Sequence, residues 1–272
     1  MKKSILILFV PLLLSCKDAS QNITFEFEAA PIQSGFIMDD YWVWGGSMIK
    51  VDSVYHLFAS RWPKTGPFPE GYRNHSEIVR ATADNPLGPF KFEEIIIGER
   101  DSAFWDANMA HNPTIHKIGD EFVLFYIGSD FTTLHPGSDN LLRRIGYARS
   151  KSIYGPWERS ENPIINQESN NPAVLVDGEK ILLMFRDKEL QVYMAEADAY
   201  QGPFTIVNDD VWPQYRLEDF YLFRSPEGYH MICEDNVGGV SGHKRSGQQL
   251  ISENDRTNWR EYADPCALLF KN

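Results

Sequence analysis

Cysteine is scarce in this 272-residue chain, and positive charge is scarcer than negative charge. Its three cysteines are Cys16, Cys233 and Cys266. Cys233 lies in an apolar stretch and Cys266 lies near the chain end, so their pattern does not indicate a disulfide framework. Lys and Arg total 26 against 38 Asp and Glu. Because such an acidic surface repels phosphate backbones, nucleic acid is not an expected partner.

A long apolar run is also missing. The apolar core of residues 1–15 follows Lys2 and Lys3 and is too short to span a bilayer as a mature helix, which is typical of a signal peptide. Leu14-Ser15-Cys16 resembles a bacterial lipobox, although a signal peptide with an incidental cysteine is the alternative. The resemblance predicts a lipoprotein signal peptide (1–15) and a tether (16–35). It also predicts an exported lipoprotein held by acyl chains at Cys16, in the periplasm or on the outer-membrane surface.

Residues 36–272 show no linker-like change of composition and are expected to form one domain. A pattern of polar start, strand, turn and aromatic strand occupies Trp105 to Gly128 and returns in altered form three more times. Each copy ends in an aromatic residue, at Phe90, Trp157, Phe204 and Trp259. The intervals between them are 67, 47 and 55 residues.

A period near fifty with four short strands per copy is the signature of a β-propeller blade. The sequence therefore predicts an all-β fold, a propeller of four-stranded antiparallel blades. A β-sandwich with accidental Gly-Pro turns is the alternative.

Polar residues stand where the first strand of each predicted blade begins. The inner strands of a propeller start around one mouth of the central axis, so these side chains are expected to converge there. They are Asp39 and Asp40 in the first copy, Asp106 and His111-Asn112 in the second, Asn170-Asn171 in the third, and Glu218-Asp219 in the fourth.

Four stretches resemble a known group of enzymes: HNPTIHKIGDEFVLFYIG, IGYARSKSIYGPW, NNPAVLVDGEKILLMF and LEDFYLF. They are similar to the five-bladed propeller glycoside hydrolases, above all family 43 and its relatives, families 117 and 32. The resemblance runs from about Met38 to Trp259. It implies an exo-acting, inverting glycosidase that cleaves oligosaccharides at the cell envelope and requires no cofactor. It also implies a five-bladed type of propeller, of which four complete blades are visible in this chain.

The same resemblance implies three axial carboxylates, because glycosidic cleavage needs one carboxyl to protonate the leaving oxygen and one carboxylate to activate water. Glu218, crowded by Asp219, is the expected acid. Asp39 or Asp40 is the expected base, unless both only cap a turn. Asp106 is the expected tuning group or substitute base. The chain departs from the family where the Asp-Pro of the first inner strand aligns with Gly46-Ser47.

Around these acids, aromatic faces could stack on sugar rings, and basic or amide groups could bind hydroxyls or a carboxylate. An ion pair for Arg186 and a plain surface position for His243 are the alternatives. Axial oxygens could hold a structural Ca²⁺, but no calcium-loop motif is present, so the metal is left open. Family 117 further implies that His111 takes the acid's role. The expected substrate-binding residues are Trp44, Arg61, Trp105, His111, Asn112, Asn171, Arg186 and His243.

Only thirteen residues follow Trp259, too few for another blade. We therefore expect an open arc in which the Val43 to Ile49 and Met231 regions do not meet, and in which the CALLF run begins a fifth inner strand. Exposed blade edges would then be a liability. A non-catalytic glycan-binding lipoprotein and a glycoside phosphorylase are the alternative functions.

Overall fold

The structure is a computed structural model that describes residues 31–68, 71–134, 140–208, 216–239, 242, 244, 246–252 and 258–261. The predictions for residues 1–30, Cys16, His243 and the CALLF run therefore lie outside the described residues. Across those described ranges, no helix has the length and apolar character that crossing a membrane requires. The lipid anchor and the export of the chain stay predictions.

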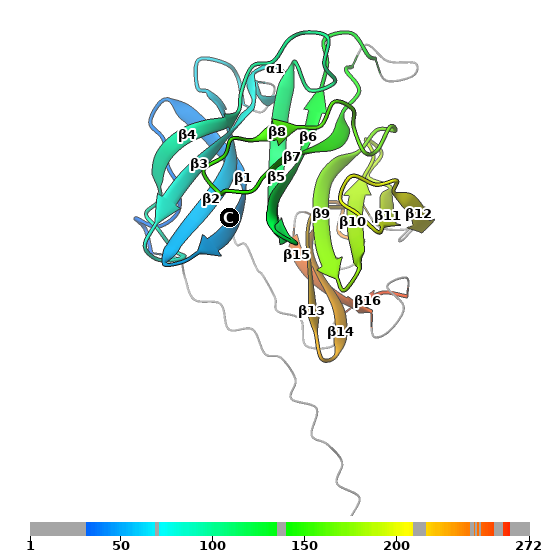
Figure 1. The fold of residues 1–272 in the computed structure, drawn as a ribbon. Coiled ribbons are helices and arrows are strands. Elements are labelled where there is room, and N and C mark those ends of the chain that lie inside the picture. The colour runs from blue at the N-terminus through cyan, green and yellow to red at the C-terminus, as the bar shows by residue number, and fades with distance from the viewer. Residues whose placement is uncertain are drawn as a thin grey trace, which may run out of the picture.

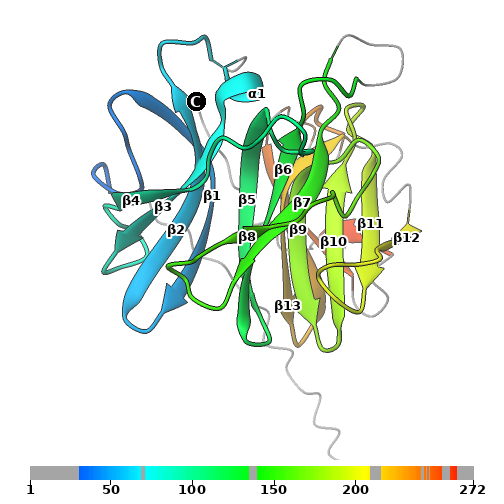
Figure 2. The same cartoon turned by 45° about the horizontal axis from the view of Figure 1, so that its top comes forward.

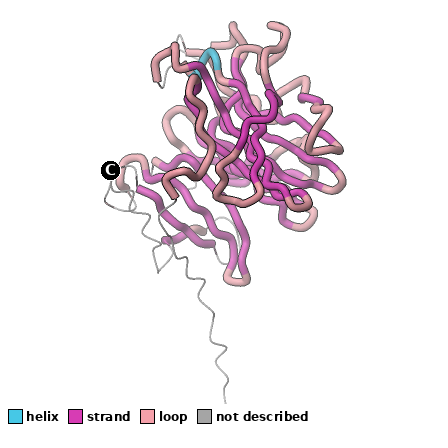
Figure 3. The backbone as a smooth tube through the Cα atoms, turned by 90° about the vertical axis from the view of Figure 1, so that its left-hand side faces the viewer, coloured by secondary structure: helices cyan, strands magenta, loops and turns pink. Residues whose placement is uncertain are grey.

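Four antiparallel sheets of four strands each make up the described chain, so the predicted fold class is confirmed (Figures 1 and 3). Blade one contains β1 (Tyr41–Val51), β2 (Val54–Pro63), β3 (Glu77–Ala83) and β4 (Lys91–Ile97), with the short helix α1 (Tyr72–His75) between β2 and β3. Blade two contains β5 (Met109–Ile118), β6 (Glu121–Ser129), β7 (Arg144–Ser150) and β8 (Glu158–Arg159). Blade three contains β9 (Asn170–Asp177), β10 (Lys180–Arg186), β11 (Val192–Ala197) and β12 (Thr205–Asn208). Blade four contains β13 (Leu217–Ser225), β14 (Gly228–Asp235), β15 (Ser246–Ser252) and β16 (Arg260–Glu261).

The second strands of blades two and three, β6 and β10, have wholly apolar central segments, because a neighbouring blade covers each face of the strand. In β6, Val123, Leu124 and Phe125 are all fully buried. Leu124 belongs to the core between blades one and two, whereas Val123 and Phe125 belong to the core between blades two and three. This two-sided burial explains why these strands show no alternation of polar and apolar residues.

The described blades form an arc. β5 packs on β1, β9 on β5, and β13 on β9, and no comparable packing joins β1 to β13 in the described part of the chain (Figures 1 and 2). Met48 on β1 is 42% exposed and Tyr221 on β13 is 64% exposed. The expected separation of the first and last blades is therefore confirmed for these residues.

One backbone feature recurs at the axial end of every blade. Each inner strand has a β-bulge, and at each bulge one residue has a left-handed φ: 50° at Gly45, 47° at Asn112, 53° at Asn171 and 54° at Asp219. These four residues are structurally equivalent. The sequence alignment that placed Gly46-Ser47 at this point of blade one is wrong by one residue, because blade one lacks the Asn-Pro pair that marks this position in blades two and three.

Candidate active site at the propeller axis

Glu218 and Asp219 begin the inner strand of blade four, where side chains from two blades meet them. An Arg186 guanidinium nitrogen lies 2.8 Å from Glu218 Oε2, and Asn236 Nδ2 donates to Glu218 Oε1. Asn171 Nδ2 donates to Asp219 Oδ1. Both Glu218 oxygens are therefore held in place, and Arg186 balances the carboxylate's charge. The structure brings four predicted site residues together here, although their roles in a reaction stay predictions.

Asn112 and Gly45 form the corresponding contact between blades two and one. The Asn112 backbone N–H donates to Ser60 Oγ at 2.8 Å. Asn112 Oδ1 is buried and has no hydrogen-bond partner. A Cβ placed on Gly45 would lie 2.5 Å from that oxygen. The absence of a side chain at Gly45 therefore lets Asn112 approach the first blade.

We expect Gly45→Ala to destabilise the fold by about 2–3 kcal/mol, because left-handed backbone is strained for alanine and the new methyl group would press on Asn112. Chemical denaturation measures the change. Gly178→Ala is the matched control, since Gly178 has a φ of 62° and open space around its Cβ position. Equal losses in the two variants would show that the Asn112 contact contributes nothing.

His111 is buried in the start of β5 rather than open to the mouth. Its Nδ1 lies 2.8 Å from Ser76 Oγ, and its ring stacks on Tyr72 at 4.7 Å and packs edge-on against Trp62 at 5.6 Å. Burial, together with the nearby charge of Arg143, lowers the pKa of His111 to about 3. His111 is therefore neutral near pH 7, with a covered ring.

The lowered pKa of His111 predicts an acid-sensitive fold. Below pH 6.5 the unfolded chain protonates this histidine while the folded chain does not until about pH 3, so stability falls as the pH decreases between these values. Denaturant unfolding at pH 4, 5 and 7 should show a smaller pH dependence for His111→Asn than for the wild type. The exposed His75 provides the control. If His75→Asn and His111→Asn changed the pH dependence equally, the explanation would fail.

Three predicted site residues have structural environments instead. Trp105 is 5% exposed, stacks on Tyr126 at 5.4 Å and donates from its indole to the Ser160 carbonyl at 3.1 Å, so its face is not available to a sugar. Arg61 lies between the rings of Tyr41 and Phe92 and binds Glu77 at 2.8 Å. Side-chain burial of this kind cannot be read from a repeat pattern.

Asp106 is the third of these residues. Its carboxylate is completely buried and lies 2.8 Å from Arg100 and 3.5 Å from Arg159. The Tyr126 hydroxyl donates to it at 2.6 Å. All three partners come from blade two or from the segment that leads into it. This is the environment of a structural ion pair.

Asp39 and Asp40 are exposed at the start of β1. Asp40 precedes the Gly45 bulge by five residues, which is about 16 Å along an extended strand. Lys64 Nζ donates to the Asp39 carbonyl at 2.8 Å, and the Lys64 backbone N–H donates to the Asp40 carbonyl at 2.9 Å. Both residues therefore lie in the bend that leads into β1, and their role as the base stays a prediction.

Trp44 does lie at the mouth, next to the Gly45 bulge. It is 45% exposed, and Phe68 lies 5.7 Å from its ring. Trp42 is 37% exposed and lies 5.2 Å from the same phenylalanine. These three rings give blade one an apolar rim suited to stacking on a pyranose face. Trp42 belongs to the strand start that the sequence predicts, but only Trp44 was expected to bind a sugar; Phe68 lies in a connection where the repeat offers no signal.

Three polar residues near the axis were also not predicted from the sequence: Asn236, Glu168 and Arg143. Asn236 follows β14, and its backbone N–H donates to the Arg216 carbonyl at 2.9 Å, which holds its side chain against Glu218. Glu168 accepts from Asn170 Nδ2 at 2.7 Å and lies 3.4 Å from Arg143. These residues come from connections between strands, where the repeat offers no signal.

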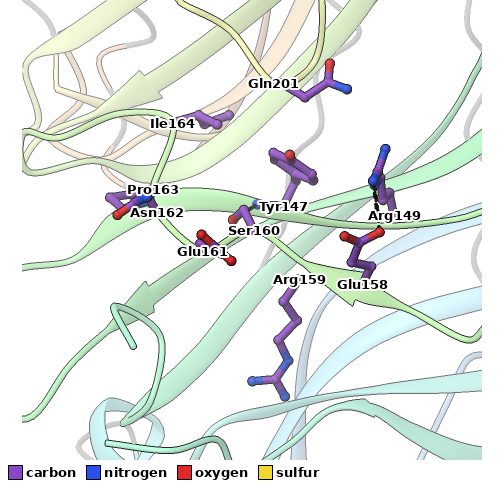
Figure 4. A pocket seen from close by; sticks show the side chains of 10 residues that line it. All are labelled: Tyr147, Arg149, Glu158, Arg159, Ser160, Glu161, Asn162, Pro163, Ile164 and Gln201. Carbon is purple, nitrogen blue, oxygen red and sulfur yellow. Dashed lines mark hydrogen bonds and ion pairs between the residues drawn. The ribbon is translucent and has the colours of Figure 1, made fainter. Parts of the chain in front are cut away.

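A cavity of about 360 Å³ lies away from these axial residues, on the outer strands of blade two (Figure 4). Arg149 and Glu158 pair across it at 2.9 Å. The Arg159 side chain turns away from the other lining residues, and it donates to the Gly98 carbonyl at 2.6 Å. Its charged groups therefore bind one another or the framework, and we assign it no function.

A metal site is not visible in the part of the chain that the structure describes. No three His, Cys, Asp or Glu side chains gather there as ligands. The predicted Ca²⁺ therefore stays untested.

Comparison with solved structures identifies the architecture. The family 117 glycoside hydrolase Zg3597 of the marine bacterium Zobellia galactanivorans superposes with a TM-score of 0.67 at 17% identity, covering 82% of this chain and 69% of that one. The catalytic domain of a family 62 α-L-arabinofuranosidase from Coprinopsis cinerea gives 0.54 at 15%, covering 83% and 69%. A thermostable family 43 glycoside hydrolase gives 0.59 at 14%, covering 83% and 73%.

The chain has the fold of these propeller glycoside hydrolases. No protein-family profile and no curated protein matches its sequence. At this level of identity the similarity establishes the fold alone, so activity has to be argued from the side chains of the axial site.

Proposed function

We propose that this protein is a glycoside hydrolase whose reaction takes place at the axial start of β13. The observation that carries the proposal is the Glu218 carboxylate, held by Arg186 and Asn236 beside Asp219. A fixed carboxyl pair at the axial start of β13 supplies acid–base groups, and the exposed ring of Trp44 beside the bulge of blade one offers a surface for a sugar.

The reaction that we propose is an inverting hydrolysis by two carboxyl groups. One protonates the glycosidic oxygen while the other takes a proton from water on the opposite face of the sugar ring. We assign the acid to Glu218 and the base to Asp219, whose orientation Asn171 fixes. Exo-action, on chain ends that enter the mouth, completes the proposal.

Incubation with aryl glycosides and with algal and plant oligosaccharides tests the function. Proton NMR of the first product should show the inverted anomer, and product sizes should show release from chain ends. Retention of configuration would overturn the inverting assignment. The absence of turnover on the whole panel would count against hydrolysis.

A non-catalytic glycan-binding protein is the second candidate. Gly45, Asn112 and Asn171 occupy the positions equivalent to Asp219, so no carboxylate from those three blades stands there. Tight binding of oligosaccharides without turnover would favour this candidate. Turnover that depends on inorganic phosphate would instead favour a phosphorylase.

A further inference from the structure

A cavity of about 310 Å³ lies between blades two and three, at the same end of the molecule as the axial site. We call it the basic pocket; its polar lining comes from Arg73 and Asn74 of α1, Ser129 at the end of β6, Asn140, Arg143, and Lys188 after β10. None of the described residues that line it is acidic. A pocket with three cations is notable in a chain where acidic residues outnumber basic ones by 38 to 26.

The positive charges of the basic pocket are only partly balanced. Arg143 lies 3.4 Å from Glu168 and donates to the Tyr72 hydroxyl at 3.1 Å, but its buried Nε has no partner. Lys188 lies 3.4 Å from Glu189, a 62% exposed carboxylate, and such surface pairs contribute little.

Arg73 is the least balanced of the three cations. It is exposed, and its recorded contact in the described structure is with the ring of Tyr72, at 5.8 Å. Clustered cations repel one another, so an anion that enters the basic pocket gains the attraction of all three.

Side-chain contacts connect the lining of the basic pocket to residues that begin the inner strands of blades two and three. Tyr72 accepts from Arg143 on one side and stacks on His111 on the other, with ring centroids 4.7 Å apart. His111 directly precedes Asn112, the axial residue of blade two. Glu168 makes a second connection, because it contacts Arg143 and also accepts from Asn170 at the start of β9. The cations of the basic pocket are therefore held by residues that also contact the axial strand starts His111 and Asn170.

We propose that the basic pocket is a subsite for a negatively charged sugar unit, bearing a carboxylate or a sulfate ester. Arg143 and Arg73 offer planar guanidinium groups that pair with either anion through two hydrogen bonds, and Lys188 adds a point charge. The proposal rests on the proposed function, since it names the substrate class of the same site. It makes the enzyme one that acts on acidic glycans.

Isothermal titration calorimetry on the full chain tests the subsite. The probes are an oligogalacturonate, a sulfated galactan oligosaccharide, a neutral galactan oligosaccharide and inorganic phosphate. We expect one or both acidic oligosaccharides to bind at least tenfold more tightly than the neutral one, with an affinity that falls as salt rises. The preferred acidic probe distinguishes carboxylate from sulfate. Equal affinity for acidic and neutral probes would overturn the proposal.

Two exposed cations allow substitution without disturbing the core. Arg73→Ala and Lys188→Ala should each weaken binding of the preferred acidic probe about tenfold, and leave neutral binding unchanged. Lys151→Ala, at a 79% exposed lysine paired with Asp120, is the matched control. Equal effects of all three variants would show only a general charge effect and overturn the assignment.

The proposal of hydrolysis and the proposal of an acidic-sugar subsite can be contradicted separately. If the wild type binds the acidic probes selectively but cleaves none of the substrates, the subsite stands and the proposed hydrolase fails. If it cleaves neutral glycans and ignores acidic ones, the hydrolase stands and the subsite fails. Phosphate that binds the basic pocket and is required for turnover would assign the pocket to a co-substrate instead, which also overturns the proposal.

Discussion

Glu218→Gln is expected to lower kcat on oligosaccharides by about two to four powers of ten while leaving the fold intact. Glutamine keeps the shape of the side chain and a carbonyl oxygen to accept from Arg186 or Asn236, but it cannot transfer a proton. Removal of a general acid or base typically costs two to four powers of ten in rate. Steady-state kinetics on the best substrate, with circular dichroism to confirm folding, measures the effect.

The leaving group shows which role Glu218 has. An acid is needed least when the leaving group is already a weak base, so the variant should recover much of its activity on nitrophenyl glycosides. A base remains necessary with every leaving group. Glu158→Gln, at a 72% exposed carboxylate on the outer strand β8, is the control and should retain wild-type rates. Full activity of Glu218→Gln on oligosaccharides would remove Glu218 from the mechanism.

The fold was readable from sequence because its signal is repeated. Each copy independently places an apolar strand after a turn, so errors in one copy are corrected by the others. The arc was also readable, since it follows from the number of copies. The local backbone geometry at the bulges could not be predicted from the sequence. Blade one has Gly45-Gly46 where blades two and three have an Asn-Pro pair, so no residue type fixed its alignment, which was shifted by one residue.

The site was predicted where the repeat itself marks it. Asn112, Asn171, Glu218 and Asp219 all stand at bulge positions that the pattern identifies. Trp105 precedes a marked position by only a few residues, yet it faces the core. Distance along the chain does not determine which way a side chain points. Asn236 and Arg143 lie in connections whose paths depend on the packing between blades, so their positions required the structure.

Arg186 shows a different limit of prediction from the sequence, namely the choice between two possible partners of one side chain. Its type and place allowed both a sugar contact and an ion pair, and the structure shows the ion pair, with Glu218 rather than Asp187 as the carboxylate partner. Its other recorded bond goes to the Asp187 carbonyl at 3.0 Å. These two contacts place Arg186 against the proposed acid, where it influences the charge of the site whether or not it touches a sugar.

Asp106→Asn is expected to lower the free energy of unfolding by about 3–5 kcal/mol, because it leaves two buried arginines without their shared counterion. Arg100 and Arg159 are 15% and 14% exposed, so water replaces little of the lost interaction. Tyr126 would change as well: burial, and then the neighbouring Asp106 charge, raises the pKa of its hydroxyl, which donates to that carboxylate. For a chain of this size we expect the melting temperature to fall by about 10 °C.

Thermal and denaturant unfolding of Asp106→Asn and Glu158→Gln measure this difference, since the surface pair of Glu158 should contribute less than about 1 kcal/mol. The same variants decide between a structural and a catalytic Asp106. A structural residue lowers stability, while the molecules that remain folded keep their kcat. If Asp106→Asn melted at the wild-type temperature but lost turnover, the carboxylate would belong to the reaction and the ion-pair interpretation would be wrong. The Asp106 carboxylate is fully buried and contacts Arg100, Arg159 and Tyr126, which leads us to expect the first result.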